Sequence, residues 1–225
     1  YKGIHGFKVQ HVTNDAVASQ MGGGTWASSN NLNTARRGAG GDGTQTAAFM
    51  VGGYTGSDSA THEQYDGSSW SEEADINSAR YSGSGMGTTT AAIHAAGQPS
   101  PTINLNEEWN GSAWSEEADL NAGKNYRAGA GTSTAAIVAG GQPPTSNNVE
   151  SWNGSSWSET TEINSVRFGA AGVGTSTATL VISGTDPGGT MDEVEQWNGS
   201  AWTEIAEINT ARAGYLAASG TTTEA

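Results

Sequence analysis

Opposite charges that could form ion pairs recur at nearly constant spacing along this chain of 225 residues. A Glu stands two positions before an aromatic residue four times, and an Arg or Lys follows a recurring Trp five times. The two sets are Glu63, Glu107, Glu150 and Glu195, and Arg36, Arg80, Lys124, Arg167 and Arg212. Residues two apart in a strand share a face. Each Glu therefore lies on the face of its aromatic neighbour, and the recurring basic residue is its expected partner.

A second group of carboxylates follows two of the recurring Trp residues and could hold Ca²⁺, a hard cation that takes oxygen ligands. Its members are Glu72, Glu73 and Asp75, and then Glu116, Glu117 and Asp119. Strand alternation points neighbouring side chains to opposite faces, and the sequence has no D-x-D-x-D-G loop. A solvated acidic face is the favoured interpretation, and we predict no metal site.

Catalytic chemistry has few candidate residues. The four His, at positions 5, 11, 62 and 94, are not equivalent in the repeats described below, so their spacing indicates neither a metal cluster nor a Ser-His-Asp group. Without Cys there is no thiolate nucleophile, disulfide or zinc finger. Paired carboxylates for glycoside hydrolysis stay open as an alternative, because nothing marks a particular pair. We predict a protein without catalytic residues or cofactors.

Composition excludes several classes of partner. The chain has 9 Lys plus Arg against 23 Asp plus Glu, a net charge of −14, and such a field repels nucleic acid and anionic membrane surfaces. No window approaches eighteen consecutive apolar residues, so no membrane insertion is expected. With 33 Gly, 8 Trp and 34% hydrophobic residues, the composition is not that of a helical protein. The first residue, Tyr1, suggests a processed chain or a fragment of a longer protein.

A repeat organises the residues named above, and repeats of this length decide the architecture. The recurring Trp residues are Trp26, Trp70, Trp114, Trp157 and Trp202, which lie 44, 44, 43 and 45 residues apart. The string G-T-x-T also occurs five times, beginning at Gly43, Gly87, Gly131, Gly174 and Gly220.

Each repeat predicts four short strands, which we call a, b, c and d in chain order. After the basic residue, a run of Gly and Ala, the G-T-x-T turn and an apolar run predict the hairpin of strands a and b. A variable loop leads to strand c, and an Asn-Gly or Asp-Gly turn leads to the Trp of strand d.

These residues resemble the kelch repeat family. The resemblance rests on a Gly pair that ends strand b (Gly52 and Gly53, then Gly140 and Gly141), Glu-x-Tyr/Trp on strand c, Trp on strand d and the Arg that follows. It implies a β-propeller in which the Glu and Arg residues form structural pairs. More narrowly, N-L-N-T-A-R with G-T-Q-T-A-A and W-N-G-S-S-W is similar to the propeller repeats of bacteriophage tail and virion proteins.

We therefore predict a single all-β domain over residues 1–225, a five-bladed propeller of four-stranded antiparallel blades. The repeats are 26–69, 70–113, 114–156, 157–201 and 202–225. Residues 1–25 are expected to supply closing strands, with residues 7–12 as strand b, that pair with the C-terminal segment. The alternative is that the N-terminal segment docks on another domain or subunit.

The sequence N-G-S at Asn110, Asn153 and Asn198 satisfies the glycosylation sequon. The same place reads Asp66-Gly67-Ser68 in one repeat, which a turn accepts and a glycan cannot use. We interpret these sites as hairpin turns.

The loops between strands b and c vary, and they share one end of the propeller with the residues after each basic residue. These loops are predicted at residues 54–59, 98–102, 142–148 and 185–190. Function tends to lie on loops held by a rigid scaffold, and aromatic and Arg side chains are common interface anchors. The predicted ligand-binding residues are Arg37, Tyr54, Tyr81, Tyr126, Arg127 and Phe168. The alternative is that these side chains only fill the central channel.

The predicted function is a non-catalytic adhesion module, on a virion surface or extracellular, that binds a glycan or protein receptor. Other virion subunits and a second copy of the chain are further possible partners. The alternatives are a structural decoration or connector protein of a phage tail or capsid, and a glycosidase or lyase on a propeller scaffold. The ligand, the source and the oligomeric state are not specified by the sequence.

Overall fold

The computed structural model describes residues 29–99, 103–212, 214 and 216–222. The chain divides into two units, residues 1–30 and residues 31–225, and all the strands belong to the second. In this described part the regular structure is sixteen β-strands. No helix among the same residues is long and apolar enough to cross a membrane.

The strands form four antiparallel sheets, the blades of a propeller, each with four strands in chain order. Blade 1 contains β1 (Gly40–Thr44), β2 (Ala47–Val51), β3 (His62–Tyr65) and β4 (Trp70–Glu73). Blade 2 contains β5 (Ser84–Gly87), β6 (Ala92–Ala95), β7 (Asn106–Trp109) and β8 (Trp114–Glu117). Blade 3 contains β9 (Ala128–Thr132), β10 (Ala135–Ala139), β11 (Val149–Trp152) and β12 (Trp157–Glu159). Blade 4 contains β13 (Ala171–Thr175), β14 (Ala178–Asp186), β15 (Gly189–Trp197) and β16 (Trp202–Ile205).

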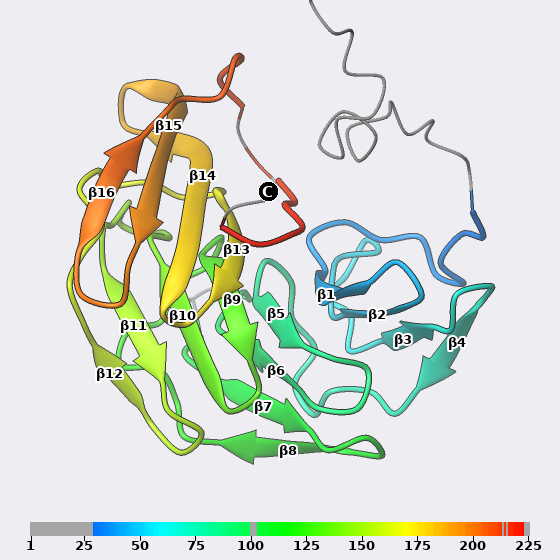
Figure 1. Cartoon of the computed structure of the whole chain (residues 1–225). Coiled ribbons are helices and arrows are strands. Elements are labelled where there is room, and N and C mark those ends of the chain that lie inside the picture. Colours follow the sequence, from blue (N-terminus) through cyan, green and yellow to red (C-terminus); the bar gives the residue numbers. More distant parts are fainter. Residues whose placement is uncertain (1–28, 100–102, 213, 215, 223–225) are drawn as a thin grey trace, which may run out of the picture. The chain divides into compact units, whose positions relative to one another are not determined.

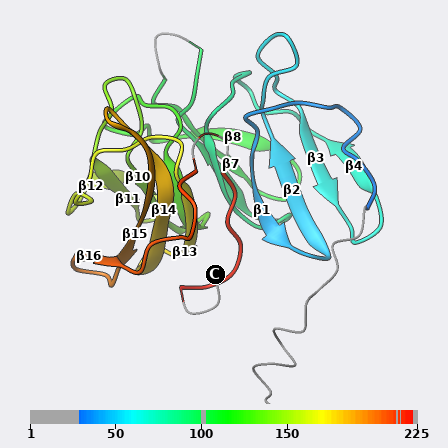
Figure 2. The ribbon, with the colours of Figure 1, turned by 90° about the horizontal axis from the view of Figure 1, so that it is seen from above.

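The inner strands β1, β5, β9 and β13 are neighbours in that order, and the outer strands begin with Trp (Figure 1). Figure 2 shows the succession from β1 to β4 within blade 1. Small residues occupy the inner strands because these strands approach one another closely. A Cβ on Gly85, for example, would lie 2.6 Å from the backbone nitrogen of Gly41 in the next blade.

The prediction of five blades is wrong, because the structure contains four. Each recurring Trp from Trp70 onwards begins the outer strand of a blade, so Trp202 of the fifth repeat belongs to β16 of blade 4. Residues 213–225 were expected to supply a strand a and the start of a strand b, but the part of them that the structure describes contains no strand. Trp26 and the predicted closing strands of residues 1–25 lie outside the described residues.

The G-T-x-T string forms the turn between strands a and b in all four blades. Gly131 has φ +124°, and a Cβ there would collide with the carbonyl oxygen of Ala135. The next residue, Thr132, accepts the backbone N–H of Ala135 through its hydroxyl at 3.2 Å. Only Gly fits the first position, and the Thr hydroxyl holds the start of strand b.

The Asn-Gly and Asp-Gly sequences form the turn between strands c and d, as predicted. Asn110 Oδ1 accepts the backbone N–H groups of Ser112 and Ala113, each at 3.0 Å. Asp66 accepts the corresponding groups of Ser68 and Ser69, each at 2.8 Å. Asn and Asp are interchangeable here because only the side-chain oxygen is used.

One predicted loop is a hairpin instead. The segment from Thr185 to Thr190 was expected to be a loop like the other b–c connections, but β14 and β15 pair across it as far as Asp186 and Gly189. Asp186 Oδ1 accepts the backbone N–H of Gly188 at 2.7 Å, and the strands shift register near Ser183. The turn sequence is Asp-Pro-Gly-Gly, which is typical of a hairpin. The comparison of the repeats favoured a variable loop instead.

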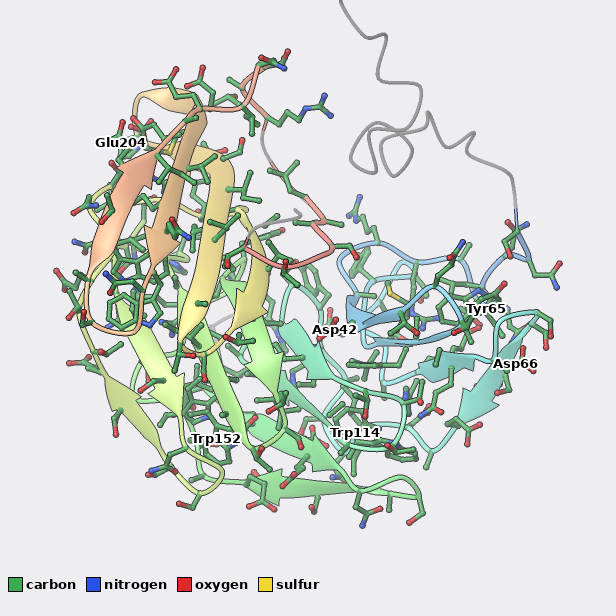
Figure 3. All side chains as sticks on the ribbon, in the orientation of Figure 1. Asp42, Tyr65, Asp66, Trp114, Trp152 and Glu204 are labelled. Carbon is green, nitrogen blue, oxygen red and sulfur yellow. The ribbon has the colours of Figure 1, made fainter. Side chains whose placement is uncertain are left out.

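The core lies between blades. Trp109 and Trp114 of blade 2, with ring centroids 5.6 Å apart, pack on Phe49 and Val51 of blade 1. The same arrangement joins blade 3 to blade 2 and blade 4 to blade 3. Figure 3 labels Trp114 and Trp152 within the stacked sheets. Burying each such aromatic side chain contributes roughly 1.5–3 kcal/mol.

Candidate functional site

The candidate site is the end of the propeller where the b–c connections meet the residues after each basic residue. Isolated antiparallel bridges join these two segments in every blade. The bridged pairs are Arg37 with Tyr54, Tyr81 with Gln98, Asn125 with Gln142 and Phe168 with Thr185. The bridges fix the backbone of the loop end, so its side chains are held by the scaffold.

Blades 1 and 2 bring three of the predicted residues together. The rings of Tyr54 and Tyr81 lie 5.3 Å apart between centroids, and the guanidinium carbon of Arg37 lies 4.9 Å from the Tyr54 centroid. The Tyr81 hydroxyl donates to Gln98 Oε1 at 2.6 Å, and burial raises the pKa of Tyr81. Arg37 is exposed and both rings are half-buried, so one cation and part of two aromatic rings are accessible to solvent.

Blades 3 and 4 contribute a second aromatic pair. The ring centroids of Tyr126 and Phe168 lie 6.2 Å apart, in an edge-to-face arrangement. Tyr126 has φ +56°, at a position where blade 1 has Gly38 with φ +62° and blade 4 has Gly169 with φ +66°. A large residue in this conformation costs of order 1–3 kcal/mol, which the surrounding structure must offset. An open hollow of about 90 Å³ lies beside Tyr126, lined also by Gly38, Ser82 and Gly169.

Arg127 was predicted to bind ligand, but the structure places it in a buried ion pair. Its Nη1 donates to Glu150 Oε1 at 2.7 Å and both side chains are inaccessible. Lys124, which occupies the expected basic position, donates instead to the carbonyl of Pro144 at 3.4 Å, and burial lowers its pKa. The run Lys-Asn-Tyr-Arg thus shifts the pairing cation by three residues.

The other three pairs follow the repeat, and the Arg of each pair lies in the segment before the blade that contains its Glu. Arg36 pairs with Glu63, Arg80 with Glu107 and Arg167 with Glu195, all buried. Each carboxylate also accepts backbone N–H groups from the segment that precedes its blade: for Glu107 these come from Asn77 at 2.7 Å and Ser78 at 3.3 Å. We call this arrangement of a Glu with its Asn, Ser or Thr, and Arg donors the carboxylate clip.

In blade 1, the hydrogen bonds of the carboxylate clip favour the ionised form of the buried Glu63. Burial alone would raise the pKa of Glu63, but Arg36 and the N–H groups of Asn33 and Thr34 outweigh it, and the net pKa is lowered. The geometry supports the predicted structural role for Arg36, Arg80, Arg167 and the four Glu residues, whereas Arg212 is exposed and forms no ion pair within the described part of the chain.

Two buried histidines were not singled out by their sequence pattern. His62 accepts the indole N–H of Trp114 through Nδ1 at 3.2 Å, and burial lowers its pKa. His94 is fully buried beside Arg80, and burial followed by the Arg80 charge lowers its pKa well below the usual value. Neither ring nitrogen of His94 has a hydrogen-bond partner among the described residues. The lowered pKa values favour the neutral form of both rings, which pack in the buried interior.

The acidic residues of the outer strands do not form a metal site in the described part of the chain. Within it, no group of three or more His, Cys, Asp or Glu side chains is placed to hold a metal ion. Glu72 and Glu73 of β4 and Glu116 and Glu117 of β8 belong to outer strands and are exposed or half-buried.

Comparison with known proteins identifies the fold. No family model and no curated protein sequence matches this chain. The solved structure of YjhT, a kelch-repeat protein, is similar, with a TM-score of 0.68 at 14% sequence identity. The match covers 81% of this chain and 68% of that one. At this identity the likeness shows the propeller fold alone. The kelch-like architecture is confirmed, while the similarity to virion repeats stays a prediction.

Proposed function

We propose that this protein is a non-catalytic binding module whose ligand, a glycan or the surface of a receptor protein, contacts the aromatic end formed by Arg37, Tyr54, Tyr81, Tyr126 and Phe168. The observation that carries the proposal is the gathering of four half-buried rings and an exposed guanidinium on loops that backbone bridges hold in place. Such side chains lose little conformational freedom when they bind.

A glycan is the ligand that this chemistry fits best. Sugar rings carry C–H faces that stack on aromatic rings, and Arg donates in-plane hydrogen bonds to hydroxyl or carboxylate oxygens. The contact with any one ring is weak, so useful affinity requires several copies of the module on one particle. Display on a virion or another extracellular surface would supply those copies, and the resemblance of the repeats to virion proteins supports that placement.

A glycan array with the full chain, displayed in multiple copies, tests the proposal. We expect binding that Tyr81→Ala reduces by about tenfold or more, since an aromatic stack contributes of order 1 kcal/mol and the Tyr54 contact is lost with it. Tyr81→Phe keeps the ring and should retain binding. Glu204→Gln, on the outer strand β16, is the control for unrelated surface changes.

Three outcomes would contradict the proposal. Equal binding by Tyr81→Ala and the unchanged chain would place the ligand elsewhere. Absence of binding to every glycan and receptor tested, together with a large ordered interface in the native particle, would favour the structural connector. Turnover of a bound glycan would favour the glycosidase or lyase.

A further inference from the structure

The Asn-Gly turns between strands c and d share one chemical feature in blades 2, 3 and 4. Asn110 Oδ1 accepts three hydrogen bonds, from the N–H and the hydroxyl of Ser112 at 3.0 and 2.8 Å and from the N–H of Ala113 at 3.0 Å. The corresponding three bonds to Asn153 and to Asn198 are 2.9 or 3.0 Å long. Each of these amide oxygens is therefore surrounded by donors that the turn holds in place.

The residue after each Asn is an exposed Gly, whose backbone nitrogen can act as a nucleophile. Gly111, Gly154 and Gly199 all have positive φ, between +91° and +94°. Because Gly has no side chain, it does not shield its own nitrogen from the side chain of the preceding residue. The N–H of Gly111 donates no hydrogen bond within the described part of the chain. The proton that this nitrogen has to lose is therefore not held by another group.

The turn thus contains the parts of an acyl-transfer site. When a backbone nitrogen attacks the side-chain amide carbon of the preceding Asn, negative charge develops on the amide oxygen. Donors about 2.7–3.1 Å from that oxygen stabilise the charge. Hydrogen bonds to an ionised acceptor are roughly twice as strong as bonds to a neutral one, so the donors stabilise the charged intermediate more than the resting amide. Ser112 and Ala113 therefore form an oxyanion hole for Asn110.

We propose that Asn110, Asn153 and Asn198 are sites of self-catalysed deamidation in the folded protein. The nitrogen of the following Gly forms a bond to the side-chain carbonyl carbon of the Asn, and the bond from that carbon to Nδ2 breaks. Nδ2 leaves as ammonia, with the proton of the Gly nitrogen, and a cyclic imide remains. Water then opens the imide at one of its two carbonyl carbons. The product is Asp, or isoaspartate when the main chain passes through the side-chain carbon.

Blade 1 shows that the turn accepts the Asp product. Asp66, labelled in Figure 3, stands in place of the Asn, and its Oδ1 accepts the N–H groups of Ser68 and Ser69, each at 2.8 Å. The N–H of Ser69 and the donors of Ser68 lower the pKa of Asp66 to about 2, so this carboxylate is ionised at neutral pH. An ionised carboxylate resists nucleophilic attack and has no ammonia to release. We therefore expect Asp66 to be stable in the same turn.

The three sites lie away from the aromatic end, and the proposal does not depend on the proposed function. Strand c leads from the b–c connection to the Asn-Gly turn, so each turn lies at the opposite end of its blade. Conversion of all three residues to Asp would add three negative charges to the net charge of −14. The charge of the protein would therefore record the age of the folded chain.

Incubation of the full chain at mildly alkaline pH, followed by peptide mapping with mass spectrometry at intervals, tests the proposal. We expect each Asn-Gly site to lose its amide about tenfold faster in the folded chain than in the same chain in concentrated urea, because only the fold places the oxyanion donors. Asn77, which is exposed but followed by Ser78, is the control within the same molecule and should react far more slowly.

Ser112→Ala is the matched variant, because it removes one donor and leaves the Asn-Gly sequence unchanged. It should slow the loss of the Asn110 amide about threefold. Asn153 and Asn198 should keep their rates, which shows that the variant is folded. Deamidation in urea as fast as in the folded chain, or faster, would mean that the turn does not promote the reaction and would overturn the proposal. An unchanged rate at Asn110 in Ser112→Ala would overturn it as well.

Discussion

At the scale of single residues, each carboxylate clip buries an ion pair and recurs once in each blade. A buried ion pair is costly to desolvate and gains only when further hydrogen bonds satisfy its atoms. Here each Glu receives backbone N–H groups as well as a guanidinium, and three of the four also receive an Asn side-chain amide. The Glu, Arg and Asn residues therefore recur because each repeat has to complete the same network.

Removing one member of a clip should be strongly destabilising. Glu107→Gln leaves Arg80 buried without its counter-ion, and we expect the free energy of unfolding to fall by about 3–5 kcal/mol. Urea denaturation followed by Trp fluorescence measures this change. Arg212→Gln is the matched control and should change stability by less than about 0.5 kcal/mol, because surface substitutions usually do. Equal effects of the two substitutions would contradict the structural role of the clip.

The buried histidines predict a dependence of stability on pH. The pKa values of His62 and His94 are lowered in the folded state, so between those values and about 6.5 the unfolded chain binds protons that the folded chain does not. Stability should be full above pH 6.5 and should fall as the pH drops below it, by at most about 1.4 kcal/mol per pH unit for each histidine.

Urea denaturation of the unchanged chain and of His94→Gln at pH 7.5 and pH 5.5 tests this prediction. The variant should lose less stability than the unchanged chain between the two pH values. An identical loss in both would show that His94 is not responsible.

At the scale of elements, the turns and strands follow directly from local sequence. The G-T-x-T and Asn-Gly strings have backbone requirements that only a few residue types satisfy. The strands they join were therefore predictable from one chain.

Gly is required at the first position of G-T-x-T for two reasons, its positive φ and the lack of space for a Cβ. Glycine substitutions should distinguish the two. Gly131 and Gly56 both have positive φ, at +124° and +116°, but a Cβ on Gly131 meets the Ala135 carbonyl while one on Gly56 meets nothing within 4 Å. We expect Gly131→Ala to destabilise by about 2 kcal/mol more than Gly56→Ala, because overpacking adds to the strain. Thermal unfolding of both variants measures the difference. Similar losses would mean that backbone strain alone explains the glycine.

Other elements could not be predicted from the repeat pattern. The pairing cation of blade 3 is Arg127 rather than Lys124, because only this repeat has an Arg three residues after the expected basic position, and its Nη1 reaches Glu150 Oε1 at 2.7 Å. The extended hairpin of β14 and β15 was missed because the alignment treated its Asp-Pro-Gly-Gly turn as one more variable loop. Both differences from the prediction depend on which residues lie close together in the folded chain. The position of a residue in its repeat does not specify this.

At the scale of the whole molecule, the sequence predicts an all-β propeller but not its number of blades. Five Trp residues suggest five units, yet four of them open the outer strands of complete sheets and Trp26 lies outside the described residues. Counting repeats differs from counting blades because the repeats that begin at Trp70, Trp114 and Trp157 each span two blades. The aromatic end was located by the order of the strands, while its contacts between Tyr54 and Tyr81 required the structure.

The net charge of −14 predicts that salt stabilises the protein. Exposed carboxylates repel one another, and the Debye length falls from about 30 Å at 0.01 M salt to about 10 Å at 0.1 M. The melting temperature should rise by several degrees between 10 mM and 300 mM NaCl. Sucrose of equal osmolality does not screen charge and should not reproduce the dependence on salt. A variant with Glu72→Gln and Glu116→Gln has fewer repelling charges, and its melting temperature should depend less on salt. An unchanged melting temperature in NaCl would contradict the prediction.

The sequence distance within each carboxylate clip bears on how the protein is made. Each Arg precedes its Glu by only 27, 27, 23 and 28 residues in blades 1 to 4. A nascent chain can therefore close each clip soon after the corresponding strand leaves the ribosome, before the next sheet has been translated. We expect the blades to form one after another during synthesis. Each blade would then present Phe, Ile or Val side chains on which the pair of Trp rings of the next blade packs.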